Sequence, residues 1–313
     1  MMYLALAGGL VILLFSGDLL VRGAVALTIR FGVPSLIVGL TVVAFGTSAP
    51  ELFVSVKAAL DGAPGISLGN IVGSNIANVL LVLGLPAMIY PTLCNQPSIR
   101  RNTAMMIGAS LLFVGVSLNG LLGTAEAMAL FALLLCFLAY SGWRAHQGVS
   151  DPVAEEIEEI AGLPEATWAI VAFLLIGLVG LPLGAELVVD GATEIARRFG
   201  VAEAAIGLTV ISIGTSLPEL ATTLVAAIRR HADVAVGNVI GSNLFNILAI
   251  GGITAMVTPL PVPESFLRFD LWVMLASAFL VAPFAFTRST ITRFAGLVFV
   301  VLYVSYLVAV FKV

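Results

Sequence analysis

Two glutamates, Glu51 and Glu219, stand in nearly identical apolar surroundings. The first lies near the end of the segment GLTVVAFGTSAPEL at 39–52, and the second lies in GLTVISIGTSLPEL at 207–220. A carboxylate at the centre of a membrane helix costs about 2.5 to 3.5 kcal/mol. Neither segment contains a lysine or arginine that could neutralise the glutamate. Two such carboxylates at equivalent positions indicate that they bind a cation.

Hydroxyl and amide side chains accompany each glutamate at helical spacing. A threonine lies four residues before each glutamate, so the two side chains share a helix face, and a serine follows the threonine. A second repeated segment, GNIVGSNIANV at 69–79 and GNVIGSNLFNI at 237–247, places a serine four residues before an asparagine. The candidate ligands are therefore Thr47, Ser48, Ser74 and Asn78 in the first copy, and Thr215, Ser216, Ser242 and Asn246 in the second.

A proline, Pro50 or Pro218, immediately precedes each glutamate. Proline has no N–H to give to the carbonyl four residues back, so we expect a broken helix with the carbonyls of Gly46 and Gly214 released. Irregular backbone at membrane depth is tolerated where it is buried in protein or lines a cavity. The all-oxygen ligand set suits a hard cation such as Ca²⁺, whereas zinc or copper would require histidine or cysteine.

One constant offset, which places residue 39 opposite residue 207, aligns both pairs of motifs. Over 33–85 against 201–253 it gives 21 identities in 53 positions without a gap, so the chain consists of two homologous halves. Hydrophobic residues make up 60% of the 313 residues and charged residues 10%, with a mean hydropathy of +1.13. An ordinary soluble domain has about a quarter charged residues, so the composition predicts a membrane protein.

The apolar runs are continuous, which favours helices over a β-barrel. A bilayer-spanning helix needs roughly 20 residues, and about ten runs qualify, five in each half. An odd number of crossings inverts the second half relative to the first. The predicted fold is an all-α polytopic membrane protein with ten transmembrane helices, arranged as inverted five-helix repeats at 1–142 and 167–313 with broken helices at the ion site. The expected spans are 3–25, 36–61, 66–90, 103–119, 122–142, 167–189, 203–228, 234–258, 270–287 and 293–311.

The segment 143–166 is the one sustained hydrophilic stretch, with six acidic residues, and is the expected linker between the halves. It is predicted to form a short solvated helix. It lacks the regularly spaced oxygen ligands and the glycine turn of a calcium-binding loop, so a calcium-sensing role is not expected. The apolar segment 1–15 is predicted to belong to the first helix rather than to a cleaved signal. Cys94 and Cys136 are far apart without ligand spacing and are expected to be free thiols.

Basic residues predict the orientation in the membrane. With the amino terminus outside, nine of the 14 lie on the cytoplasmic side, together with the linker, and five lie outside, which agrees with the positive-inside tendency. Both termini are then extracytoplasmic. The cytoplasmic group is Arg22, Arg30, Arg100, Arg101, Arg144, Arg229, Arg230, Arg288 and Arg293, and the external group is Lys57, Arg197, Arg198, Arg268 and Lys312.

Two carboxylates can balance one divalent or two monovalent cations. A site of this kind between two inverted halves, reached alternately from each side, predicts an antiporter in which Ca²⁺ and Na⁺ compete. Outside the site, Asp18 aligns with Glu186 and is expected to play a structural role at an interface rather than to guide ions. Arg22 is expected to lie at a helix end.

The paired GTSAPE and GTSLPE segments, the paired GSNxxN segments and the ten-helix inverted layout resemble the cation/calcium antiporter superfamily. They are most similar to its prokaryotic sodium/calcium exchanger branch, and the resemblance extends over essentially the whole chain. It implies extrusion of Ca²⁺ driven by Na⁺ entry, with more than one Na⁺ per Ca²⁺ and net charge movement. It also implies that the first and sixth helices slide past a core formed by the other eight.

The resemblance further implies a role for each candidate ligand. Both glutamates would hold Ca²⁺ through their carboxylates, and both threonines would contribute backbone oxygens. Four serines, Ser48, Ser74, Ser216 and Ser242, would shape flanking Na⁺ sites with the carbonyls of Ala44 and Ser212, and Asn78 and Asn246 would line the centre. Some prokaryotic members have an aspartate at the position of Asn246, so the number of titratable groups and the coupling to Na⁺ and H⁺ stay open.

Three other transport functions remain as alternatives: a K⁺-dependent Na⁺/Ca²⁺ exchanger, an H⁺/Ca²⁺ exchanger of the same superfamily, and a passive cation channel. An enzyme is not expected, because no nucleophile with a base and no metal-binding histidine motif is evident. No cofactor is expected. The predicted partners are Ca²⁺, Na⁺ and the lipid bilayer of a bacterial or archaeal cell membrane, with no nucleic acid and no evident obligate protein partner.

Overall fold

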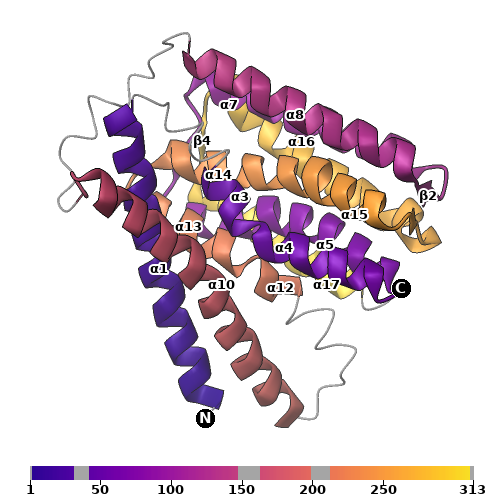
Figure 1. Ribbon diagram of the computed structural model, residues 1–313, viewed down its shortest axis with the longest axis horizontal. Helices are drawn as coiled ribbons and strands as arrows, with labels where there is room; N and C mark the ends of the chain where they lie inside the picture. The colour runs from indigo at the N-terminus through magenta and orange to yellow at the C-terminus, as the bar shows by residue number, and fades with distance from the viewer. Residues whose placement is uncertain (1, 32–41, 147–162, 199–211, 311–313) are drawn as a thin grey trace.

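The computed structural model describes residues 2–31, 42–146, 163–198 and 212–310, and these form a helical bundle with two very short β-ladders (Figure 1). The helical segments of the first half are α1 (Met2–Phe31), α3 (Ala44–Thr47), α4 (Ala49–Leu60), α5 (Pro64–Ala77), η2 (Asn78–Leu83), α6 (Gly84–Ile89), α7 (Pro97–Ser117) and α8 (Thr124–His146). Those of the second half are α10 (Thr167–Arg198), α12 (Ser212–Thr215), α13 (Leu217–Ile228), α14 (Ala232–Leu244), η5 (Phe245–Ile250), α15 (Gly251–Val257), η6 (Phe266–Asp270), α16 (Leu271–Thr287) and α17 (Arg293–Val310).

The all-helical membrane fold expected from the sequence is confirmed. Seven helices or helix runs within the described residues are long and apolar enough to cross a membrane. The expected span 103–119 lies largely within the 21-residue helix α7, which carries Arg100 and Arg101 near its start. The expected spans 36–61 and 203–228 lie partly outside the described residues and end in the short helices α3–α4 and α12–α13. Most of the linker 143–166 also lies outside them.

Both glutamate-bearing segments are broken helices. The break falls on Ser48 between α3 and α4 and on Ser216 between α12 and α13, with nearly the same backbone angles: φ −86° and ψ 5° at Ser48, φ −87° and ψ 3° at Ser216. Each proline therefore lies in the first turn of the second helix rather than inside a continuous one. The missing proline N–H is tolerated there, because the first turn has no partners for its N–H groups.

Each half also contains a π-helix, η2 directly after α5 and η5 directly after α14. Neither was predicted from the sequence. π-Helical turns are rare and are frequent at functional sites. These two include Asn78 and Asn246, the residues expected to line the centre of the ion site.

Backbone conformation repeats with the same offset as the sequence. Left-handed residues occur at Gly62 (φ 75°) and Gly120 (φ 77°) in the first half, and at the equivalent positions Arg230 (φ 63°) and Arg288 (φ 54°) in the second. A left-handed conformation is disfavoured for a non-glycine residue. Its retention at two arginines indicates that the turn geometry of the repeat overrides local preference.

Strand pairing shows that the second half is inverted relative to the first. β1 (Thr92–Leu93) pairs with β4 (Thr290–Ile291), and β2 (Leu121–Leu122) pairs with β3 (Leu260–Pro261). Helix α7 separates β1 from β2 by roughly 30 Å, at 1.5 Å per residue. The repeat makes β3 the counterpart of β1, yet β3 pairs with β2 at the far end of α7. Equivalent segments of the two halves therefore lie at opposite ends of the bundle.

Helices α1 and α10 form a pair that is distinct from the rest of the bundle. They lie against each other on one flank and extend beyond the other helices near the amino terminus (Figure 1). Glycine permits this contact: a Cβ on Gly177 would lie 2.9 Å from the Cα of Leu20, and one on Gly184 would lie 2.9 Å from the backbone nitrogen of Leu13. The large apolar core, by contrast, is formed mainly by α5 to α8 and α14 to α17.

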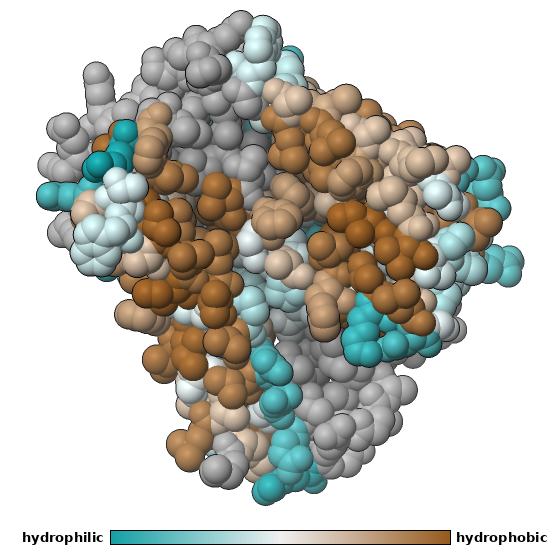
Figure 2. All heavy atoms as spheres, viewed as in Figure 1, coloured by the Kyte–Doolittle hydropathy of each residue, from teal (hydrophilic) through white to brown (hydrophobic). Residues whose placement is uncertain are grey.

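Large apolar side chains remain exposed on the outer faces of these helices. Figure 2 shows them over the flank formed by α1 and α10 and over the neighbouring bundle. Leu4, Val11 and Phe15 of α1 are 60 to 74% exposed, and Val179 of α10 is 59% exposed. An apolar surface of this extent does not suit water. It identifies the face that contacts lipid.

Candidate cation site

Glu51 and Glu219, from opposite halves of the chain, converge in the interior. Each is 1% exposed. Ser48 of the first half donates a hydrogen bond from its hydroxyl to the Oε1 atom of Glu219, at 3.0 Å. The broken helices of the two repeats therefore contribute to one site rather than to two separate ones.

Each glutamate lies in the first turn of its helix, Glu51 in α4 and Glu219 in α13. The unpaired N–H groups at a helix start carry a partial positive charge, which stabilises a nearby carboxylate by about 0.3 to 1 kcal/mol, more when partly buried. The helix break thus places two helix starts beside two carboxylates. The helix starts offset a small part of the free-energy cost of burying two carboxylates. Most of that cost remains and would have to be offset by a bound cation.

Nine of the 18 buried side-chain atoms that lack a hydrogen-bond partner within the described residues belong to the two glutamates and the other predicted ligands. The Oε2 atoms of Glu51 and Glu219 are buried and form no hydrogen bond within the described structure. Unpaired buried polar groups cost roughly 1 to 3 kcal/mol each, so such a set requires an explanation. The same condition holds for the hydroxyls of Ser74, Ser216 and Ser242 and for both amide atoms of Asn78 and Asn246. Seven of the twelve residues predicted from the sequence therefore present free ligand atoms.

The remaining predicted ligands are placed differently. The Ala44 carbonyl accepts hydrogen bonds from the Ser48 backbone N–H at 3.0 Å and from the Thr47 hydroxyl at 3.3 Å. The Thr47 hydroxyl has a single proton to share between this carbonyl and the Oδ1 atom of Asn238, which lies 3.4 Å away, so the second lone pair of the Ala44 oxygen is only partly engaged. Ser212 begins α12, and its side chain lies outside the described structure.

Two asparagines that were not predicted from the sequence hold the site together. The Asn70 amide donates to the Glu51 carbonyl at 3.0 Å and to the Ser55 hydroxyl at 2.8 Å, and its Oδ1 accepts from the Thr215 hydroxyl at 3.3 Å. Asn70 therefore links the glutamate of its own half to the broken helix of the other half.

Asn238 repeats this arrangement from the second half. Its amide donates to the Glu219 carbonyl at 3.3 Å and to the Thr223 hydroxyl at 2.9 Å, and its Oδ1 accepts from the Thr47 hydroxyl at 3.4 Å. The side chains of Thr47 and Thr215 are thus engaged in joining the halves. The identity of Asn70 and Asn238 across the repeat was the signal that could have identified both.

A second asparagine pair lies where the halves meet. Asn243 donates its amide to the Asn75 carbonyl at 3.4 Å and to the Met106 sulfur at 3.6 Å. The Asn75 amide instead donates to the Ile71 carbonyl of its own helix. These residues support the contact between α5 and α14.

The side chains gathered here carry oxygen atoms, the ligand type that hard cations prefer. The described part of the chain contains no group of three or more His, Cys, Asp or Glu side chains that could hold a metal ion. Its available ligands are instead two carboxylates and several neutral hydroxyl and amide oxygens. Ca²⁺ takes six to eight oxygen ligands of this mixed kind. The fold and the site together define a polytopic membrane protein in which a buried glutamate from each half lies between the two repeats.

The chain belongs to the sodium/calcium exchanger family, whose family model, described as "Sodium/calcium exchanger protein", matches residues 1–143 and 169–312. It is 32% identical to the sodium/calcium exchanger MaX1 of Methanosarcina acetivorans, over 99% of both chains. It is 37% identical to the inner membrane protein YrbG of Escherichia coli, over 90% of this chain and 87% of that protein. A solved structure of the sodium-calcium exchanger NCX_Mj, soaked with zero Na⁺ and Ca²⁺, matches with a TM-score of 0.84 and 31% identity, over 99% of this chain and 100% of the other.

Proposed function

We propose that this protein exchanges Na⁺ for Ca²⁺ across the membrane and binds both ions at the site between Glu51 and Glu219. The observation that carries the proposal is the convergence of one buried glutamate from each inverted half. Two carboxylates neutralise one Ca²⁺ or two Na⁺, so occupancy by one ion excludes the other. Membership of the exchanger family supports the same conclusion.

The free oxygen atoms support a division of the site. We assign Ca²⁺ to the two glutamates, with the backbone oxygens of Thr47 and Thr215, and with Asn78 and Asn246 lining the centre. The serines Ser48, Ser74, Ser216 and Ser242 would complete flanking Na⁺ sites. Ala44 and Ser212 would also contribute carbonyls there; the Ala44 carbonyl already accepts one hydrogen bond from the Ser48 backbone N–H.

Inverted repeats provide the means of exchange. In such transporters the site stays near the middle of the membrane while one part of the protein moves against the rest, so that access alternates between the two sides. Helices α1 and α10 pack mainly against each other and outside the large apolar core, which supports their assignment as the moving part. This is the motion that the family resemblance implies.

The arginine distribution supports an orientation with both termini outside. The predicted cytoplasmic arginines gather at one end of the bundle: Arg293 donates to the Ile89 carbonyl, Arg230 lies over the ring of Tyr90, and Arg229 contacts Asp18. This end also contains the β1–β4 ladder. We assign it to the cytoplasm of a prokaryotic cell.

The experiment is ⁴⁵Ca²⁺ uptake into proteoliposomes of the purified full chain, with Na⁺, K⁺ and pH varied in turn. We expect uptake that requires Na⁺ inside the vesicles and does not require K⁺ or a pH gradient. Uptake driven by a pH gradient without Na⁺ would assign the protein to H⁺/Ca²⁺ exchange, and an absolute K⁺ requirement would assign it to K⁺-dependent exchange. Unitary currents without a counter-ion would instead identify a channel.

A further inference from the structure

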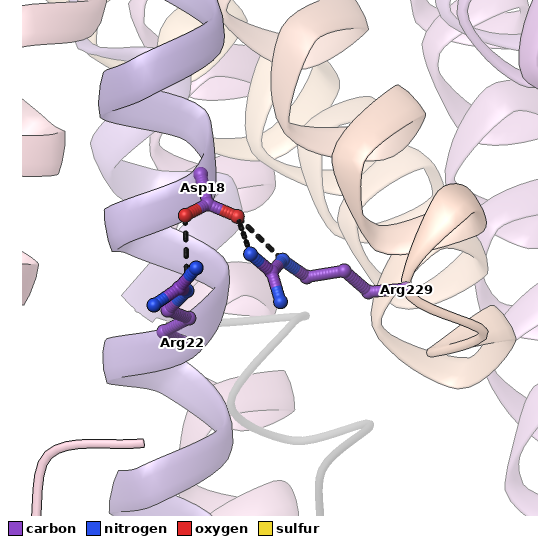
Figure 3. A network of polar contacts seen from close by, with 3 residues as sticks. All are labelled: Asp18, Arg22 and Arg229. Carbon is purple, nitrogen blue, oxygen red and sulfur yellow. Dashed lines mark hydrogen bonds and ion pairs between the residues drawn. The ribbon is translucent and has the colours of Figure 1, made fainter. Parts of the chain in front are cut away.

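An ionic network joins the α1–α10 pair to the end of α13. Figure 3 shows Asp18 of α1 between Arg22, one turn further along the same helix, and Arg229, directly after α13. Arg22 Nε lies 2.9 Å from Asp18 Oδ2, and Arg229 contacts Asp18 Oδ1 through Nε and Nη2. The three side chains are 23 to 27% exposed. Arg22 therefore lies within α1, two turns before its end, and the expectation of a helix-end residue was wrong.

Close apolar packing accompanies this network. A Cβ on Gly17 would lie 3.3 Å from the carbonyl carbon of Ala221, so α1 and α13 approach at this point as closely as glycine allows. Beside it, Val21 of α1 is fully buried and packs in a cluster with Val225 of α13. The moving pair and the rest of the bundle are thus in firm contact at this end.

The equivalent contact is missing at the other end. The repeat makes α10 the counterpart of α1 and α4 the counterpart of α13. Within the described residues, α10 and α4 share no packing comparable to that of α1 and α13. Phe53, the counterpart of Ala221, is 69% exposed. Lys57 and Asp61 of the same region are also exposed and pair with each other.

The residues at the second interface do not suit the same contact. Where the first interface has Gly17 against Ala221, the second would bring Ala185 against Phe53. The counterpart of Val225, which packs in the apolar cluster, is Lys57. Bulkier and charged side chains would therefore prevent α10 from approaching α4 as closely as α1 approaches α13.

The charged residues of the two interfaces differ even more than their apolar residues do. At the first interface one carboxylate, Asp18, lies between two arginines. The repeat replaces Asp18, Arg22 and Arg229 by Glu186, Asp190 and Asp61. Three carboxylates would then face a single cation, Lys57, which already pairs with Asp61 at 2.6 Å. Carboxylates brought together repel each other. The charged groups therefore attract where α1 meets α13, and they would repel where α10 approached α4.

We propose that Asp18 and Arg229 are positioning residues that favour one state of the transport cycle, the state in which α1 packs against α13. The proposal rests on the proposed function, because exchange by inverted repeats requires a second state in which α10 packs toward α4. The ion pair stabilises the first state and has no counterpart in the second. With the arginine-rich end in the cytoplasm, the favoured state closes the cytoplasmic side.

The test compares the apparent Ca²⁺ affinity of the full-length exchanger measured from each membrane face, in right-side-out and inside-out vesicles. An apparent affinity scales with the population of the state that exposes the site to that face. Asp18→Asn or Arg229→Gln should weaken Ca²⁺ binding from the face at which Lys57 lies and strengthen it from the face at which Arg229 lies. We expect the ratio of the two affinities to change about five-fold, as for a partly shielded ion pair.

A control and a rescue separate this role from a general loss of structure. Arg268→Gln removes an exposed ion pair between Arg268 and Glu264, which does not join the two bodies, and should leave the ratio unchanged. The charge-reversed variant Asp18→Arg with Arg229→Asp should restore the wild-type ratio, and it keeps the test valid if a single variant fails to fold.

Two results would overturn the proposal while wild-type exchange is intact. One is a change of both affinities in the same direction in the single variants, and the other is an unchanged ratio. Failure of the charge-reversed variant to restore the ratio would also count against it. Absence of Na⁺-dependent Ca²⁺ transport in the wild-type protein would instead overturn the proposed function.

Discussion

At the scale of single residues, each glutamate is fixed through its backbone and keeps one carboxylate oxygen unpaired within the described structure. Asn70 and Asn238 hold the two glutamate carbonyls, and Thr215 and Thr47 of the opposite halves hold the two asparagines. In the proposed site, the ligands would thus be oriented before an ion arrives. Preorganised ligands bind more tightly because less ordering is required on binding.

Asn70→Ala should weaken Ca²⁺ binding about ten-fold. The substitution removes three hydrogen bonds around Glu51, each worth about 1 kcal/mol, and about half of this lost free energy should appear as weaker Ca²⁺ binding. Calorimetric titration of the purified protein with Ca²⁺ measures this. The matched control is Asn75→Ala on the same helix, since the Asn75 amide donates to the Ile71 carbonyl of its own helix and not to the glutamate. Equal losses in both variants would contradict the positioning role of Asn70.

His231 lies in the turn before α14, outside the membrane spans, and is 6% exposed. Burial, with a smaller contribution from the nearby Arg229, lowers the pKa of its imidazole from 6.5 to about 4. The unfolded chain therefore binds a proton near pH 6.5 that the folded protein does not, so the folded state loses stability as pH falls from about 6.5 toward 4. His231→Asn should reduce the drop in Tm between pH 7.5 and pH 5. A drop of the same size in both proteins would argue against this source of acid sensitivity.

At the scale of helices, the contact of α1 with α10 depends on small residues at defined positions. A Cβ on Gly9 would lie 2.8 Å from the Gly184 carbonyl oxygen and the Val188 backbone nitrogen, whereas a Cβ on the adjacent Gly8 would meet nothing within 4 Å. The two positions thus provide a test of the helix pair with the same substitution on neighbouring residues.

Gly9→Ala should destabilise the protein by about 1 to 3 kcal/mol through overpacking against α10. Gly8→Ala should not lower the stability of the protein and should raise it slightly, because alanine has a better helix propensity than glycine. Thermal unfolding followed by intrinsic fluorescence compares the two variants. If they unfold at the same temperature, α1 and α10 do not form the close pair described above.

The helices also show which features could be predicted from the sequence. Repetition of GTSxPE predicted the broken helices, because proline and buried glutamate have strong local consequences. The π-helices after α5 and α14 and the hydrogen bonds of Asn70 and Asn238 could not be predicted in this way. They depend on which helices face one another across the two halves, and a one-dimensional pattern does not contain that information. Arg22 was misplaced for a related reason: α1 continues to Phe31, beyond the apolar run.

At the scale of the whole molecule, the repeat is symmetric in backbone and asymmetric in charge. The left-handed turns follow the same offset as the sequence repeat, and the β-ladders follow it to within one residue, while the charges around α13 and α4 have opposite signs. Symmetry supplies two related states, and asymmetry makes them unequal in energy. A carrier with this design favours one direction of access when no ion is bound.

Exchange of more than two Na⁺ for each Ca²⁺ would move net positive charge with Na⁺. Ca²⁺ uptake into Na⁺-loaded proteoliposomes should therefore rise when the interior is made positive, for example by valinomycin with K⁺ higher outside. Each elementary charge moved across 100 mV corresponds to about 2.3 kcal/mol. An uptake rate independent of this potential would indicate electroneutral exchange of two Na⁺ for one Ca²⁺.

The central claim is that Ca²⁺ and Na⁺ compete for one site formed by a glutamate from each half. Equilibrium ⁴⁵Ca²⁺ binding to the purified protein at increasing Na⁺ tests it most directly, in the wild type and in Glu51→Gln and Glu219→Gln. We expect Na⁺ to displace Ca²⁺ from the wild type and each variant to bind Ca²⁺ at least about 100-fold more weakly, since one partner of a buried charge cluster is lost. Unchanged Ca²⁺ affinity in either folded variant, or binding insensitive to Na⁺, would contradict the claim.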